Sequence, residues 1–194
     1  MPIFPELIDE KFPVNAKLSN GTPVLIRNIH ADDTDLLWAF FKEIPIHDKL
    51  YLKEDLSEPE VAREWCQNLD YCSMLPVIAL IEGKIVGYTL LQHETRTWQR
   101  HTGTVRMAVH PGYRGMGLAK LLLSHVVDMG MHCGLDRLQA EVMGEQKAAI
   151  RLFESFGFVK MAVVPKHVID NNGTAHDYVL MVYPMRDVER HAAD

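Results

Sequence analysis

Residues 109–119 read Val-His-Pro-Gly-Tyr-Arg-Gly-Met-Gly-Leu-Ala. The stretch joins an apolar strand pattern to a helix pattern, and within it Arg114, Gly117 and Ala119 form Arg-x-x-Gly-x-Ala. A turn of small residues at the start of a helix leaves backbone N–H groups pointing outward, where the helix dipole adds positive potential. Because glycine has no side chain to block a close approach, this turn can hold a pyrophosphate without a cationic side chain.

Two other phosphate-binding patterns also place a glycine-rich turn between a strand and a helix. The Rossmann fingerprint requires Gly-x-Gly-x-x-Gly, but Gly115 and Gly117 are followed by Lys120 where the third glycine would stand. The P-loop requires Gly-Lys-Ser or Gly-Lys-Thr at its end, and the turn has neither. The sequence on either side of the turn is therefore needed to decide which phosphate-binding motif this is.

Hydrophobic periodicity outside the turn predicts strands and helices in alternation. A capping box of Ser57 and Glu60, with Pro59 in the first turn, predicts the start of one helix. Strands are expected at residues 23–29, 75–81, 85–93, 104–109, 137–143, 158–169 and 176–185. Helices are expected at about residues 33–43, 57–69, 118–129 and 145–156, and irregular chain is expected at 1–16, 46–56 and 94–103.

This order of elements predicts an α/β chain with a mixed sheet. We expect an N-terminal arm at residues 1–21, a single domain at 22–186 and a C-terminal tail at 187–194. A length of 194 residues is enough for one domain with a substantial core.

Composition narrows the classes of function. Apolar residues make up 47% of the chain and the formal net charge is −6, which argues against general binding of nucleic acid. Three cysteines without a Cys-x-x-Cys pattern predict neither disulfides nor a zinc site, and we expect no metal. The first 14 residues lack an apolar targeting segment and no apolar run reaches membrane-spanning length, so we expect a cytoplasmic protein with no membrane partner.

A second motif lies in the predicted helix at 145–156 and just after it. Residues 146–158 read Gln-Lys-Ala-Ala-Ile-Arg-Leu-Phe-Glu-Ser-Phe-Gly-Phe. Together with Arg-x-x-Gly-x-Ala and the order of elements, this stretch resembles the GNAT superfamily of acetyl-CoA-dependent N-acetyltransferases. That family commonly has Asn-x-x-Ala-x-x-Leu-Tyr here, followed by Gly-Phe. Gln146 replaces the family asparagine and Phe153 replaces the family tyrosine.

The resemblance implies the GNAT fold, with a central mixed but mostly antiparallel sheet, about four flanking helices, and fourth and fifth strands that splay apart. It also implies acetyl-CoA as co-substrate, with its pantetheine arm in the gap between those strands and its pyrophosphate on the turn. The residues expected to bind it are Met107, Ala108, Val109, Arg114, Gly115, Met116, Gly117, Leu118, Ala119 and Gln146.

The implied activity is transfer of an acetyl group to a primary amine of a protein lysine, a protein N-terminus or a small molecule, by direct attack in a ternary complex. A general base must deprotonate the amine, and Glu141, in the middle of a predicted strand, is the candidate. It could equally face solvent or pair with Arg106, and His93 and Glu94 are weaker alternatives.

The missing tyrosine hydroxyl leaves the general acid open. Phe153 cannot protonate the leaving thiolate, and Ser155 and Tyr178 are the substitutes that the sequence offers. The alternative function is therefore an acyl-CoA-binding sensor that has lost catalysis. Among stand-alone bacterial members, the chain is similar to protein-lysine acetyltransferases, and its N-terminal arm is compatible with a homodimer.

Overall fold

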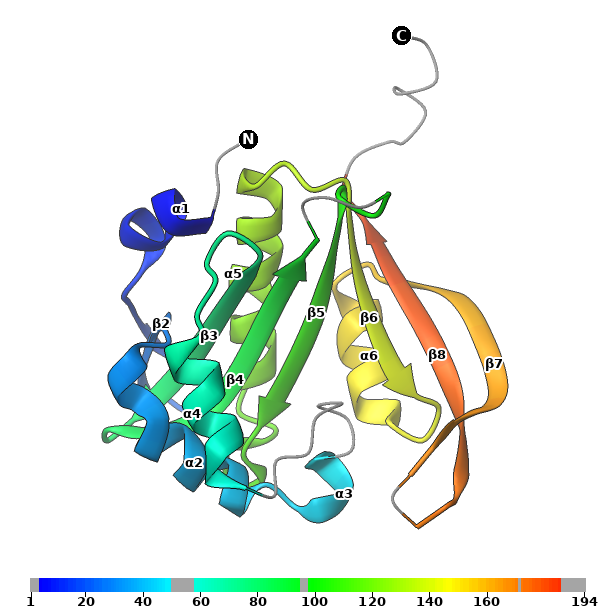
Figure 1. Ribbon diagram of the computed structural model, residues 1–194, viewed down its shortest axis with the longest axis horizontal. Coiled ribbons are helices and arrows are strands. Elements are labelled where there is room, and N and C mark those ends of the chain that lie inside the picture. The colour runs from blue at the N-terminus through cyan, green and yellow to red at the C-terminus, as the bar shows by residue number, and fades with distance from the viewer. Residues whose placement is uncertain (1–3, 50–57, 95–97, 171, 186–194) are drawn as a thin grey trace, which may run out of the picture.

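The computed structural model describes residues 4–49, 58–94, 98–170 and 172–185. In that part of the chain one sheet has eight strands in the order β1-β2-β3-β4-β5-β6-β8-β7 (Figure 1). The strands are β1 (Val14–Lys17), β2 (Pro23–Asn28), β3 (Met74–Ile81), β4 (Lys84–His93), β5 (Thr102–Val109), β6 (Arg137–Met143), β7 (Val159–Ile169) and β8 (Ala175–Pro184). The helices are α1 (Phe4–Lys11), α2 (Thr34–Glu43), α3 (Ile46–Lys49), α4 (Pro59–Gln67), α5 (Leu118–His132) and α6 (Lys147–Ser155).

The sheet is split between β5 and β6. These strands are parallel and pair only where Thr102–Thr104 of β5 meets Arg137–Gln139 of β6. Beyond Thr104 the strands diverge, while the other neighbouring strands pair in antiparallel fashion. The predicted fold class, with its splayed fourth and fifth strands, is confirmed: the predicted fourth strand is β5 and the predicted fifth is β6.

Helices cover the two faces of the sheet unequally. The helices α5 and α6 pack on one face, where Leu122, Val126 and Phe153 are buried. On the opposite face α2 and α4 cover β3 and β4, and the side chains of Phe41 and Tyr88 are buried there. Among the described helices none lies over this second face at β6, β8 and β7 (Figure 1). The described helices therefore leave that side of the split uncovered (Figure 1).

The N-terminal residues differ from the irregular arm that was expected. Residues 4–11 form α1, whose Ile8 is buried in the core beside α5, and β1 pairs with β2. An eight-residue helix and a four-residue strand are too short to be stable alone, so packing against the rest of the chain decides their structure. The hydrophobic periodicity of residues 4–17 alone therefore did not predict α1 or β1.

Smaller differences concern element boundaries. Residues 46–49 form the short helix α3 inside a stretch expected to be irregular. The helix α4 begins at Pro59 with Glu58 as its N-cap, and the predicted N-cap Ser57 lies outside the described residues. The predicted tail at 187–194 lies outside them too. No described helix has the length and apolar character needed to span a membrane.

Candidate functional site

A large cleft lies where the end of β5 meets the first turns of α5 and α6. It encloses about 1830 Å³ of empty space, including the part that opens to solvent. We call it the cofactor cleft. Its lining comes from four regions of the chain: Ser19; Ile44 and Asp48; Met107–Val109, Tyr113–Gly115 and Gly117–Lys120; and Glu145–Ala149 with Leu152.

The glycine turn presents its backbone to this cleft. Gly115 has φ +76° and Gly117, the N-cap of α5, has φ +83°, a left-handed conformation that favours glycine. A side chain on Gly115 would meet no protein atom within 4 Å and would project into open space. Among the described contacts, no protein group accepts a hydrogen bond from the backbone N–H groups of residues 115–120. The turn therefore offers a row of donors to an anion.

Side chains of the turn anchor it to the end of α2 and to α3. The His110 Nδ1 accepts a hydrogen bond from the Gly112 N–H at 3.1 Å, which leaves Nε2 to meet a Glu43 carboxylate oxygen, also at 3.1 Å. The Arg114 guanidinium donates from Nε to the Val109 carbonyl at 3.2 Å and pairs through Nη2 with Asp48 on α3. Arg114 thus joins the end of β5 to α3 across the mouth of the cleft.

A smaller pocket occupies the split itself. It is lined by Thr104–Met107 of β5, Ala140–Val142 of β6, and Gln146, Ala149 and Phe153. We call it the gap pocket, and it shares Met107, Gln146 and Ala149 with the cofactor cleft. Glu141 lines this pocket together with Arg106 and is partly exposed.

Two residues of the second motif lie at the junction of the cleft and the gap pocket. The Gln146 Oε1 accepts a hydrogen bond from the Met143 N–H at 2.8 Å, which fixes the side-chain amide at the end of β6. Phe153 is buried against Phe158, with 4.9 Å between ring centroids, and its ring lines the gap pocket. The family tyrosine position therefore faces the split but carries no hydroxyl group.

The structure brings together nine of the ten predicted cofactor-binding residues in the lining of the cleft. The exception is Met116, whose sulfur contacts the Asn20 amide at 3.6 Å and whose carbonyl accepts from the Ser19 N–H. Sequence reasoning missed Lys120 and Lys147, one in the first turn of each helix that borders the cleft. The sequence feature that could have identified them is their position, because Lys120 lies three residues after Gly117 and Lys147 lies one residue after Gln146.

Other candidates from the sequence lie elsewhere. His93 sits opposite Gly103, at the closed end of the split, and its ring contacts the Arg100 carbonyl. The Ser155 hydroxyl donates to the Leu152 carbonyl at 2.7 Å, and Ser155 lines neither cavity. Tyr178 lies on β8 opposite Met143, and burial raises the pKa of its hydroxyl.

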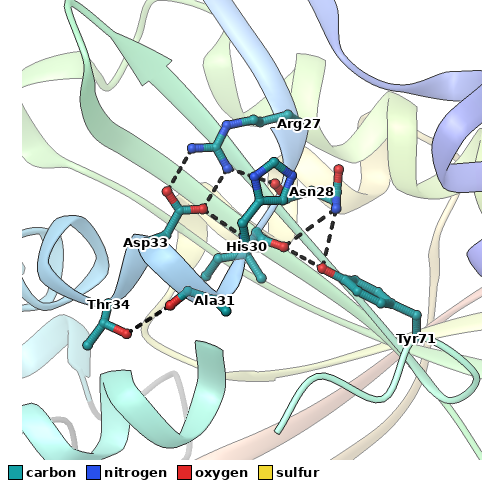
Figure 2. Close-up of polar contacts among 8 residues, drawn as sticks. Arg27, Asn28, His30, Ala31, Asp33, Thr34 and Tyr71 are labelled. Carbon is teal, nitrogen blue, oxygen red and sulfur yellow. Dashed lines mark hydrogen bonds and ion pairs between the residues drawn. The ribbon is translucent and has the colours of Figure 1, made fainter. Parts of the chain in front are cut away.

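A polar network far from the cleft fixes the entry into α2. Arg27 donates two hydrogen bonds to the Asp33 carboxylate, at 2.6 and 2.7 Å, and the His30 N–H donates a third at 2.7 Å (Figure 2). The Tyr71 hydroxyl donates to the Ile29 carbonyl in the same network. Tyr71 therefore has a structural position rather than one in the cleft.

Two observations indicate that the residues of the cofactor cleft and of the split are suited to acetyl-CoA. The donors of residues 115–120 match a pyrophosphate, and Lys120 and Lys147 add positive charge at the rim. On the side of β5 that faces β6, the backbone beyond Thr104 has no strand partner, so an extended pantetheine chain can lie along it.

The structure is an α/β domain in which the glycine turn at the start of α5 lies beside a split sheet. The sequence profile of the acetyltransferase (GNAT) family matches residues 35–158, more than half of the chain. The chain therefore belongs to the acetyltransferase (GNAT) family.

Individual relatives agree with this assignment. The L-amino acid N-acyltransferase MnaT of Escherichia coli strain K12 is 36% identical over 67 residues, which are 34% of this chain and 39% of that protein. The ribosomal protein bS18-alanine N-acetyltransferase of the same strain is 33% identical over 79 residues, 41% of this chain and 53% of that protein. The chain thus spans about two fifths to one half of these curated relatives.

A solved structure shares the fold. The structure of yncA from Salmonella typhimurium with its cofactor acetyl-CoA has a TM-score of 0.70 at 20% identity, covering 84% of this chain and 95% of that one.

Proposed function

We propose that this protein transfers the acetyl group of acetyl-CoA to a primary amine, by direct attack of the amine in a ternary complex. The observation that carries the proposal is the adjacency of two cavities. The cofactor cleft and the gap pocket share Met107, Gln146 and Ala149 in their linings, and the gap pocket is also lined by a carboxylate, Glu141, in the middle of β6. A donor held in the cleft would therefore place its acyl end beside a candidate base.

The residues of the cleft have separable roles in holding the donor. The backbone N–H groups of residues 115–120 bind the pyrophosphate, and Lys120 and Lys147 neutralise phosphate charge. Residues 107–109 of β5 pair with the pantetheine arm, and a backbone N–H of this stretch polarises the thioester carbonyl. Bound acetyl-CoA supplies the activated acetyl group.

Glu141 acts as the general base in this proposal. An amine such as lysine is protonated at neutral pH, because its ordinary pKa is about 10.4, and it becomes a nucleophile only after losing a proton. The buried Leu138, Ala140 and Val142 alternate with Glu141 along β6, which places Glu141 on the other face of the strand. No described helix covers that face, so an acceptor that approaches from there would not displace the donor (Figure 1).

No dedicated general acid is needed at position 153. Phe153 excludes water from one wall of the gap pocket but has no proton to give. A thiol has an ordinary pKa of about 8.5, so the thiolate is a good leaving group and can take its proton from water after departure. The relatives named above act on an L-amino acid and on a ribosomal alanine, and we propose an amino group of an amino acid or a protein as acceptor.

The test is release of free thiol from acetyl-CoA, measured against amino acids, lysine peptides, peptides with free N-termini and polyamines. Glu141→Gln keeps the size of the side chain and removes the base, and should lower kcat by about 10²- to 10⁴-fold. Glu82→Gln, a surface change in the turn between β3 and β4, is the control and should leave the rate unchanged. Binding of acetyl-CoA to both variants, followed by calorimetry, should match the wild type.

A second function is favoured by the phenylalanine in the gap pocket, namely a sensor that binds acyl-CoA without turning it over. Tight binding of acetyl-CoA with no thiol release from any amine would support the sensor. Thiol release that survives Glu141→Gln would keep the enzyme and reject Glu141 as its base.

A further inference from the structure

The gap pocket is lined by residues from both faces of the sheet, and the two sides of its lining differ in chemistry. On the opposite face from α6 the lining is polar and includes Thr104, Arg106 and Glu141. No described helix covers this face at β6, β8 and β7 (Figure 1), and we call it the uncovered face. Towards α6 the lining is apolar and includes Val105, Met107, Ala140, Val142, Ala149 and Phe153.

Arg106 and Glu141 lie at the same level on the two sides of the split. Thr104 and Gln139 form the last pair between β5 and β6, and their side chains are hydrogen-bonded to each other at 3.0 Å. Arg106 and Glu141 each follow two residues later, and side chains two residues apart point to the same face of a strand. The polar side of the pocket therefore has a guanidinium on one wall and a carboxylate on the other.

These two groups are complementary to a molecule that carries an amine and a carboxylate close together. A guanidinium has five N–H donors in a planar fork that matches a carboxylate, so Arg106 can hold a protein group and still bind a ligand. Glu141 attracts the ammonium form of an amine. A polyamine would instead bring a second positive charge towards Arg106, and the amide next to a peptide amine has no charge to offer it.

Beyond Glu141 the uncovered face is apolar. Leu180 of β8 is paired with Glu141 and is also paired with Ala162 of β7. Tyr178, two residues from Leu180 on the same face, is paired with Val164, whose side chain is 39% exposed. Side chains of directly paired residues lie about 5 Å apart, so a group bound at Glu141 would have apolar side chains beside it.

We propose that this side of the gap pocket binds a free α-amino acid with an apolar side chain and presents it as the acetyl acceptor. The amino group lies at Glu141, the carboxylate is bound by Arg106, and the side chain packs on Leu180 and Tyr178. The inference rests on the proposed acetyl transfer and narrows its acceptor class. Neither a lysine side chain of a protein nor a protein N-terminus has a carboxylate on the carbon that bears its amine.

The atoms of the transfer balance in this arrangement. The amine nitrogen bonds to the acetyl carbonyl carbon, and the carbon–sulfur bond of the thioester breaks. The ammonium form loses two protons in all, of which one passes through Glu141 to solvent and the other ends on the sulfur of CoA. Arg106 takes no proton, so it is a binding residue that fixes where the amine lies.

The experiment compares thiol release from acetyl-CoA with leucine, leucinamide and alanine as acceptors. Leucinamide keeps the amine and the side chain of leucine but has no carboxylate, whereas alanine keeps both charged groups and little of the side chain. We expect kcat/KM for leucine to exceed that for leucinamide by about 100-fold, because charge-assisted hydrogen bonds are lost. It should exceed that for alanine by about tenfold.

Variants assign these preferences to residues. Arg106→Gln should raise KM for leucine by about 100-fold with a smaller effect on kcat, and the ratio between leucine and leucinamide should fall towards one. Arg137→Gln is the matched control, because Arg137 lies on the same face at the closed end of the split and lines neither cavity. Leu180→Ala should lower the preference for leucine over alanine, whereas Ile169→Ala, at an exposed apolar position of β7, should not.

Calorimetric titration of leucine into the protein saturated with CoA gives a readout that needs no turnover. Leucine should bind to the wild type and to Arg137→Gln, and about 100-fold more weakly to Arg106→Gln. Equal rates with leucine and leucinamide, or discrimination that survives Arg106→Gln, would overturn the inference and leave acetyl transfer intact. If no amine released thiol, acetyl transfer would fail. Leucine binding that depends on Arg106 would then still support the site, and absence of leucine binding would refute it.

Discussion

Asp33 is a buried carboxylate at the junction of β2 and α2. Burial by itself would raise the pKa of Asp33, but the hydrogen bonds from Arg27 and from the His30 N–H outweigh it and hold the pKa below its ordinary value. The same pairing raises the pKa of Arg27. The pairing thus favours the charged form of both groups, and each depends on the other.

Removing one partner should destabilise the fold. We expect Asp33→Asn to lower the free energy of unfolding by about 3 kcal/mol, because it leaves the partly buried Arg27 without its counter-charge. Urea unfolding at pH 7 measures the change. Asp32→Asn, at the exposed neighbouring position, is the control and should alter the midpoint little.

The pH dependence follows from the lowered pKa. A carboxylate with a depressed folded-state pKa stabilises the fold above its unfolded value of about 3.9, and this contribution is lost as the pH falls through the folded value. The difference between the wild type and Asp33→Asn should therefore shrink as the pH is lowered from 5 towards 2. A difference that stays constant in this range would contradict the assignment.

At the scale of elements, two glycines in similar turns allow the effect of backbone strain to be distinguished from an effect on ligand binding. Gly115 and Gly83 both have φ +76°, and an added Cβ would meet no protein atom within 4 Å at either position. Gly83 lies in the hairpin turn between β3 and β4, whereas Gly115 lines the cofactor cleft.

Replacing either glycine by alanine should cost about 1–2 kcal/mol of stability, because both changes place a Cβ at positive φ. Only Gly115→Ala should weaken the binding of acetyl-CoA, by at least tenfold, since its methyl group enters the space where the pyrophosphate is proposed to lie. Calorimetric titration measures the affinity and thermal unfolding measures the strain. Equal affinities of the two variants would place the pyrophosphate elsewhere.

The elements that the sequence predicted well share one property, which is a strong apolar pattern within the element. The helix α5 carries regularly spaced apolar residues, and the strands β3 and β4 are almost continuously apolar and buried, so their own sequences specify them. The helices α1 and α3 and the strand β1 have eight residues or fewer and form against surfaces supplied by distant segments. Contacts of that kind leave no local pattern.

The candidate site divides in the same way. The glycine turn could be predicted because its chemistry needs glycines at a fixed spacing, which the sequence displays. The pairing of Arg114 with Asp48 could not, because 66 residues separate them and the pair depends on where α3 lies against the turn. The direction of the Met116 side chain, which contacts Asn20, could not be predicted either, because a motif gives the position of a residue along the chain but not where its side chain points.

For the molecule as a whole, the two halves of the sheet meet over three residue pairs at the closed end of the split. Gly103 sits there, and a Cβ on it would lie 2.7 Å from the Cδ1 atoms of Leu91 and Leu135 and 3.0 Å from a methyl of Leu138. These three leucines are fully buried, so the neighbours have little room to move away.

Gly103→Ala should therefore lower the activity by shifting β5 relative to β6, although Gly103 lines neither cavity. We expect the rate of thiol release to fall about 100-fold, because a displacement of about 1 Å between reacting groups has that effect. Gly130→Ala is the control, since its Cβ would crowd the same Leu138 at 3.1 Å from the side of α5. Unfolding by urea should show a smaller loss for Gly130→Ala, because alanine favours a helix more than glycine does. Equal rates of thiol release would refute a special role for the closed end.

A small change of angle at that closed end produces a larger displacement at the open end of the split. Val109 lies five residue steps along β5 from Thr104, which is about 16 Å of strand. A rotation of this part of β5 by about 5° about Thr104 would move Val109 by about 1.4 Å, which is close to the length of one carbon–carbon bond. The packing of Leu91, Leu135 and Leu138 around Gly103 therefore influences how far β5 and β6 stand apart at the open end of the split.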